Sequence, residues 1–157
     1  MYKKIYILFL IILPITLTSC GYKKLKDPAK NLFYINSINT SGDVRIGYYL
    51  KNEILLNSSK QSLNKINIEI NSKKTNKIKT KDTTGTAKKY TLTIESQMIV
   101  SDSNYQKIFS KTFVNSVEYD VGKSVSTTLA RERKSITSSK SVIAEEISKY
   151  LNIYFNN

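Results

Sequence analysis

The segment "NKINIEIN", residues 64–71, contains the clearest structural signal in the chain. Ile66, Ile68 and Ile70 alternate with polar residues, so in an extended chain their side chains leave one face and the polar side chains leave the other. The pattern predicts a β-strand with one face against an apolar core and the other face in water.

Three other segments have the composition or the alternation of strands. Residues 32–38, "LFYINSI", are rich in residues that favour strands. Two later segments, residues 89–101 and 106–121, alternate and are joined by the turn-like "SDSNY", which predicts a β-hairpin. Their apolar faces carry Tyr90, Leu92, Ile94, Met98 and Val100 in the first and Phe109, Phe113, Val117, Tyr119 and Val121 in the second.

The segment 72–88, "SKKTNKIKTKDTTGTAK", is rich in Lys, Thr, Ser and Gly and has no apolar period. We interpret it as a loop or a disordered hairpin tip. The shorter "NTSGD", residues 39–43, is expected to form a turn in which Ser41 or Asp43 caps the following helix.

Two segments have the period of an amphipathic helix. In residues 43–57 the apolar positions recur three or four residues apart, and in residues 126–155 they recur at similar steps from Leu129 to Tyr154. The middle of the second segment is polar and has weak helix propensity, so we expect a possible break near Ser138–Ser139.

The expected order is therefore β-α-β-β-β-α. Four strands with one apolar face and two amphipathic helices predict an α+β fold, a two-layer sandwich with a four-stranded, mainly antiparallel sheet and two helices on one face.

The composition argues against several classes of function. The chain has 157 residues, a formal net charge of +13, no histidine and one cysteine, so it lacks Ser-His and Cys-His pairs and the His/Cys clusters that hold zinc. We expect a protein that is not an enzyme and needs no metal or cofactor, although Lys, Tyr, Ser and Asp could still supply chemistry. Twenty-two of the 25 basic residues are lysine, a bias that AT-rich coding would produce, so the charge alone does not indicate a nucleic-acid partner.

The N-terminus has the organisation of an export signal. Lys3 and Lys4 precede an apolar run, residues 5–17, that is too short to span a bilayer comfortably. The run ends in Leu17-Thr18-Ser19-Cys20, which resembles a lipobox, in which the cysteine is lipidated and becomes the first residue of the mature chain. We therefore interpret residues 1–19 as a lipoprotein signal peptide and residues 20–31 as a lipidated tether. The alternative is an ordinary signal peptide with an incidental cysteine.

A covalent lipid on Cys20 would anchor the chain stably if it carried two or three acyl chains. Gly21 follows the cysteine, whereas an Asp there resembles the signal for retention in the inner membrane of enteric bacteria. We therefore expect an outer-membrane location.

The mature chain also resembles the family of lipopolysaccharide-assembly lipoproteins called LptE. The resemblance rests on Cys20-Gly21-Tyr22, on "INTSGDVRIGYYLKNEILLN", on "KYTLTIESQMIVSD", and on the C-terminal "YDVGKSVSTTLARERKSI" and "AEEISKYLNIYF", in that order. It implies an LptE-like α+β domain over residues 32–157. It also implies a function: to plug and help assemble the β-barrel LptD in the outer membrane, and to bind lipopolysaccharide on its way there.

The candidate lipopolysaccharide contacts are lysines, because lipid A carries phosphates and lysine is a point-charge partner for phosphate. They form the densest basic stretch of the chain and its neighbours: Lys73, Lys74, Lys77, Lys79, Lys81, Lys88 and Lys89. The alternative is a solvated surface that serves solubility. For Arg131 and Arg133 we expect exposed ion pairs with neighbouring acids.

Other functions remain open from the sequence. An auxiliary or pilot lipoprotein of another envelope transport or secretion complex would keep the same anchor and differ in its partner. An envelope hydrolase without histidine would need a pocket with converging Lys, Ser or Tyr. A nucleic-acid partner is not expected in an exported protein.

Overall fold

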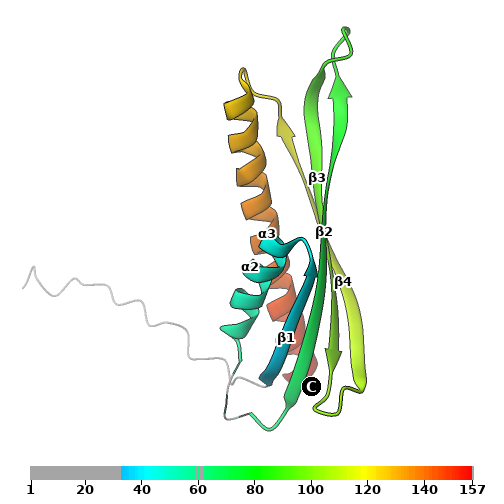
Figure 1. The fold of residues 1–157 in the computed structure, drawn as a ribbon, viewed down its shortest axis with the longest axis vertical. Coiled ribbons are helices and arrows are strands. Elements are labelled where there is room, and N and C mark those ends of the chain that lie inside the picture. Colours follow the sequence, from blue (N-terminus) through cyan, green and yellow to red (C-terminus); the bar gives the residue numbers. More distant parts are fainter. Residues whose placement is uncertain (1–32, 59, 61, 157) are drawn as a thin grey trace, which may run out of the picture.

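The computed structural model describes residues 33–58, 60 and 62–156, which form six elements in one α+β unit (Figure 1). The predicted signal peptide, the tether and Cys20 lie outside the described residues. The elements are β1 (Tyr34–Gly42), α2 (Val44–Leu55), β2 (Lys65–Lys81), β3 (Ala87–Ser101), β4 (Lys107–Asp120) and α3 (Val125–Asn156). The predicted order and fold class are confirmed.

The four strands form one sheet in the order β1-β2-β3-β4. The two pairs β2–β3 and β3–β4 are antiparallel, whereas β1 and β2 are parallel. The parallel pair follows from α2, which carries the chain back so that β2 starts beside the start of β1. The sheet is thus mixed, and mainly antiparallel as expected.

Both helices cover the same face of the sheet, α2 over β1 and β2 and α3 over β3 and β4 (Figure 1). The isoleucines of "NKINIEIN" point into this layer, where Ile68 is fully buried. The core also takes buried residues from both helices and the other strands, among them Leu50, Ile54, Ile94, Met98, Ile143, Ile147 and Leu151.

The molecule is long and its two ends differ (Figure 1). The start of β1, the end of α2, the β3–β4 turn at 102–106 and the last turn of α3 form what we call the proximal end. The β2–β3 turn at 82–86 and the first turns of α3 form the distal end. β1 and α2 cover only the proximal half, because the last residue of β1, Gly42, pairs with Ser72 in the middle of β2.

The prediction of a loop or disordered tip over 72–88 is wrong. β2 continues to Lys81, a turn occupies 82–86, and β3 begins at Ala87. β2 and β3 pair continuously from Asn67–Ser101 to Ile78–Tyr90. The apolar alternation ends at Ile70 because the distal half of β2 has little helix above it, so backbone pairing rather than burial holds it as a strand.

The predicted break in the second helix is also wrong, because α3 runs unbroken through Ser138 and Ser139. Ser139 is fully buried in the same stripe as Ile143 and Ile147. Packing against the sheet and α2 therefore supplies the stability that the local propensity lacks.

The expected turn at 39–43 is mostly strand, since β1 extends to Gly42. Gly42 has a φ of +80°, and a Cβ there would lie 2.1 Å from the carbonyl oxygen of Ser72. Only glycine suits both conditions. The next residue, Asp43, is the helix cap, and its carboxylate accepts hydrogen bonds from the backbone N–H groups of Arg45 and Ile46 at 3.1 Å.

We expect Ile68→Ala to lower the free energy of unfolding by about 2–5 kcal/mol, because it leaves a cavity in the core. Ile78→Ala is the matched control: it makes the same substitution in the same strand, at a side chain that is 48% exposed. Its cost should be about 1 kcal/mol or less. Urea denaturation measures both, and equal losses would contradict the assignment of the core to the proximal half of β2.

Candidate functional site

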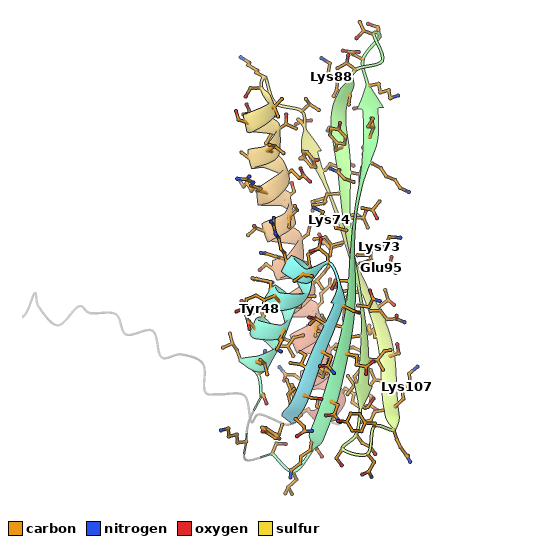
Figure 2. The ribbon with its side chains drawn as sticks, in the orientation of Figure 1. Tyr48, Lys73, Lys74, Lys88, Glu95 and Lys107 are labelled. Carbon is orange, nitrogen blue, oxygen red and sulfur yellow. The ribbon has the colours of Figure 1, made fainter. Side chains whose placement is uncertain are left out.

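The seven candidate lysines do not form one cluster. Strand alternation sends Lys73 and Lys77 to the face of the sheet without helices, and Lys74 to the face with helices. Lys73 and Lys74 are labelled in Figure 2. Lys79 also reaches the open face, where it contacts Glu118. Lys81 ends the strand, and Lys88 and Lys89 begin the next one beyond the turn.

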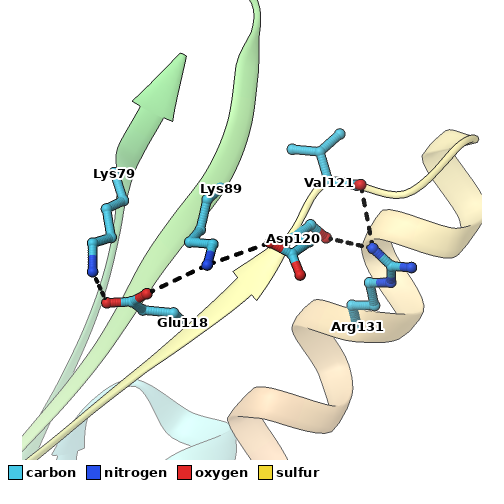
Figure 3. Close-up of polar contacts among 6 residues, drawn as sticks. All are labelled: Lys79, Lys89, Glu118, Asp120, Val121 and Arg131. Carbon is cyan, nitrogen blue, oxygen red and sulfur yellow. Dashed lines mark hydrogen bonds and ion pairs between the residues drawn. The ribbon is translucent and has the colours of Figure 1, made fainter. Parts of the chain in front are cut away.

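Four of these lysines are paired with acids. Lys79 and Lys89 both contact Glu118, the latter at 3.8 Å, and Lys89 also lies 3.6 Å from Asp120 (Figure 3). The Lys79 hydrogen bond, aided by the charges of Lys79 and Lys89, holds the pKa of Glu118 below its usual range. The other two pairs are Lys88–Asp82 at 3.2 Å and Lys74–Glu132 at 3.9 Å.

The remaining three candidates, Lys73, Lys77 and Lys81, are exposed. Within the part of the chain that the structure describes, none has an acid within ion-pair distance. They are the candidate lysines whose charge is available to an external anion.

Arg131 does not form the ion pair expected from the sequence. Its guanidinium donates to the backbone carbonyl oxygens of Asp120 and Val121, each at 3.2 Å (Figure 3). Arg131 therefore ties the start of α3 to the end of β4. The acid between the two arginines, Glu132, pairs with Lys74 across the layers.

Arg133 lines a basic groove of about 340 Å³. The groove lies where the start of α2, the middle of β2 and the middle of α3 meet, and is lined by Asp43, Arg45, Ile46, Lys74, Arg133, Ile136, Thr137 and Lys140. One of its four cations, Lys74, is paired with Glu132, and the single carboxylate in its lining, Asp43, caps α2. With two isoleucines among its walls, the groove suits an anionic group attached to an apolar body.

Of the residues that line this groove, the sequence predicted only Lys74 as a lipopolysaccharide contact, whereas it predicted Asp43 as a candidate helix cap and Arg133 in an exposed ion pair. Arg45 lies in α2 and Lys74 in β2, whereas Arg133 and Lys140 lie two turns apart in α3. The Lys140 ammonium lies 4.4 Å from the ring centre of Tyr49. A spacing of seven residues puts Arg133 and Lys140 on one side of α3, but only tertiary packing brings them beside Arg45 and Lys74, so no local pattern predicts the groove.

The second candidate surface is the face of the sheet without helices. Its side chains are mainly hydroxyls, amides and charges, as the alternation predicted, and Thr93 and Ser116 exchange a hydrogen bond across it at 2.9 Å. Val114, 54% exposed, is an apolar exception. The polar residues include Asn39, Ser41, Glu69, Asn71, Lys73, Thr75, Lys77, Thr91, Thr93, Glu95, Gln97, Thr112 and Ser116.

This open face is hollowed by a groove of about 270 Å³ that crosses β1, β2 and β3 beside Asn39, Asn71 and Gln97. Near the proximal end, the amide oxygen of the buried Asn67 accepts hydrogen bonds from Ser37 at 2.7 Å and Asn36 at 3.1 Å, and its amide nitrogen donates to the carbonyl of Asp102. The face is therefore polar, ordered and free for a partner with many hydrogen-bonding groups.

The described residues contain no group of three or more acids and cysteines placed to hold a metal ion. None of their helices is long and apolar enough to cross a membrane. A raised pKa occurs at Tyr119, where burial is the main cause and the amide of Asn76 is the hydrogen-bond partner.

The arrangement defines a class: a two-layer α+β domain in which a β-α-β crossover precedes two antiparallel strands and a long C-terminal helix, with the other sheet face open. No family model matches the chain, and no curated protein matches it. Solved structures share its fold at identities that establish the fold alone.

The three structures given next are each described as a lipoprotein. One, from Caulobacter crescentus, is 14% identical, with 82% of this chain and 95% of that chain covered at a TM-score of 0.59. An uncharacterized lipoprotein B from Nitrosomonas europaea is 12% identical, with 80% and 88% covered and a TM-score of 0.61. Rare lipoprotein B from Shewanella oneidensis is 13% identical, with 76% and 93% covered and a TM-score of 0.52.

The distal turn gives a test of the local electrostatics. Hydrogen bonds from Thr84 and Thr86, with the nearby Lys88, lower the pKa of Asp82 from 3.8 to about 2. Because the pKa of the unfolded chain is about 4, this carboxylate stabilises the hairpin above that pH, and the contribution is lost as the pH falls toward 2.

We expect Thr84→Ala to raise the pKa of Asp82 toward its ordinary value, since the Thr84 hydroxyl is the largest cause of the shift. Thr83→Ala, in the same turn, should leave that pKa unchanged. NMR titration of the carboxyl carbon reads both, and an Asp82 midpoint near 4 in the unmodified protein would refute the hydrogen-bonded turn.

Proposed function

We propose that this chain is a lipoprotein anchored through Cys20 in the outer membrane, where it plugs and helps assemble an LptD-type β-barrel and binds lipopolysaccharide during its delivery. The observation that carries the proposal is the open, polar sheet face on an elongated domain. The resemblance of the sequence to LptE and the fold shared with three structures described as lipoproteins support it. The proposal assigns no catalysis, metal, cofactor or nucleic-acid partner.

The plug part of the proposal follows from the character of the two faces. The lumen of a wide outer-membrane barrel is polar, so a domain that fills it needs a polar outer surface. Here one face of the sheet is closed by α2 and α3, and the other presents hydroxyl and amide groups that can pair with a lumen wall. A long shape with an uncovered sheet suits insertion along a barrel axis.

The lipopolysaccharide part rests on two sets of cations. The basic groove offers Arg45, Lys74, Arg133 and Lys140 beside apolar side chains, which matches a phosphate joined to acyl chains. The second set is Lys73, Lys77 and Lys81, the three candidate lysines without an ion-pair partner among the described residues. The paired lysines Lys79, Lys88 and Lys89, and Lys74 within the groove, contribute less, because an external anion would compete with their acids.

The partner is tested by mild-detergent purification of the full-length tagged protein from its own membranes, with mass spectrometry of what accompanies it. We expect one large outer-membrane barrel in near-equal amount. The matched variant Cys20→Ser should lose its acyl groups and its membrane retention. Recovery with subunits of another transport or secretion complex would favour the auxiliary or pilot function instead, and recovery alone would leave the barrel proposal unsupported.

The second set is tested by replacing Lys73, Lys77 and Lys81 together with glutamine. At about 0.5 kcal/mol for each exposed charge pair, the loss of affinity for lipopolysaccharide should be about tenfold. Replacing Lys51, Lys123 and Lys134 removes the same charge elsewhere and should cost less than about twofold. Equal losses would mean that net charge alone, and not this set of lysines, attracts the lipid.

A further inference from the structure

The proximal end gathers exposed apolar side chains from four separate segments. The end of α2 gives Leu55 and Leu56, the segment before β2 gives Leu63, the β3–β4 turn gives Tyr105, and the last turns of α3 give Ile153 and Tyr154. Leu56, Leu63 and Tyr105 are 78%, 96% and 72% exposed. Exposed single apolar residues are ordinary on a protein surface, but their convergence from four segments on one end is not.

The distal end also has exposed apolar side chains, Ile78, Val125 and Leu129, but these come from only two elements, β2 and α3. The turns of the sheet at the two ends differ more clearly. The turn at the distal end, residues 82–86, reads Asp-Thr-Thr-Gly-Thr and is entirely polar. The turn at the proximal end, residues 102–106, holds Tyr105 with a φ of 62°. A bulky residue in this left-handed conformation is uncommon, and here it belongs to a turn that leaves the ring exposed.

Positive charge accompanies the apolar residues. Lys65 and Lys107 are the first residues of β2 and β4, and Lys149 lies in the last part of α3; all three are exposed. Figure 2 labels Lys107 at the proximal end. The nearby Asp102 carboxylate makes no ion pair with these lysines; it accepts hydrogen bonds from the backbone N–H groups of Asn104 and Gln106. Apolar and aromatic side chains with lysines around them match the interface of a bilayer that contains anionic lipids.

The chain also enters the domain at this end. Phe33, the first described residue, is buried against Phe155 of the C-terminal helix, with ring centres 5.4 Å apart. Only twelve residues separate it from Cys20. Fully extended, they span at most about 45 Å, so a lipid on Cys20 keeps the proximal end near the membrane and the distal end farther away.

We propose that the proximal end docks on the phospholipid surface in which the chain is anchored, with Leu56, Leu63, Tyr105 and Tyr154 in the interfacial layer. This inference rests on the lipid anchor of the proposed function but not on the barrel or on lipopolysaccharide. It sets the orientation of the free lipoprotein, with the long axis away from the membrane and the open sheet face accessible from the side.

The chain has no tryptophan, so a single introduced tryptophan reports its own surroundings. The experiment uses the full-length lipoprotein, purified from membranes and reconstituted into vesicles of phosphatidylethanolamine and phosphatidylglycerol with brominated acyl chains. Leu56→Trp and Leu63→Trp place the probe at the proximal end. Val125→Trp is the matched control at the distal end, since Val125 is 77% exposed.

We expect the two proximal tryptophans to shift to shorter emission wavelengths and to be quenched by the brominated lipid, while the control at position 125 stays water-like. Equal quenching at both ends, or none at either, would overturn the docked orientation. A blue shift that grows with protein density and not with brominated lipid would indicate contact between copies and would also overturn it.

The anchor has its own readout in the same samples. Vesicle flotation and the mass of the protein report whether it is lipidated and membrane-bound. Unlipidated protein that fails to float would overturn both the anchor and the docking, whereas lipidated protein with unquenched proximal tryptophans would overturn the docking alone. The barrel proposal is unaffected by these results because the vesicles contain no barrel.

Discussion

The continuous pairing of β2 with β3 is the interaction on which the rest of the structure depends. The pairing runs from Asn67–Ser101 near one end of the molecule to Ile78–Tyr90 near the other. It aligns the isoleucines of β2 with Ile94, Met98 and Val100 on one face, which gives the helices a surface to cover. The same register places threonines, serines and lysines together on the opposite face.

The sequence predicted those parts of the fold in which buried side chains recur at the regular spacing of a strand or a helix. The alternation around Ile66–Ile70, the hairpin through Leu92 and Phe113 and the amphipathic helices were all found from apolar spacing. The distal half of β2 was missed because its order comes from backbone hydrogen bonds, which leave no pattern in the side chains. The continuity of α3 through Ser139 was missed for a related reason. Serine has weak helix propensity, and the sequence does not show that Ser139 is buried against the sheet and α2.

The candidate site divides in the same way. The alternation predicted that the open face is polar and exposed to solvent, and the structure has a polar, exposed face there. The basic groove could not, because Arg45, Lys74 and Arg133 are brought together by the crossover after Gly42 and by the packing of α3. Gly42 itself illustrates the limit: its need for a positive φ and for the absence of a Cβ depends on Ser72, thirty residues later.

The early end of β1 has a consequence for self-association. Beyond Ser72, β2 has no neighbour on its outer side among the described strands, so its backbone amides and carbonyls form an open edge. An exposed edge strand is a template for adding a strand from another chain. Lys73, Lys74, Lys77, Lys79 and Lys81 fall along this edge, and lysine is a residue that natural edges use to repel such additions. The charge of these lysines therefore opposes the addition of a further strand along this edge, whatever ligand they bind.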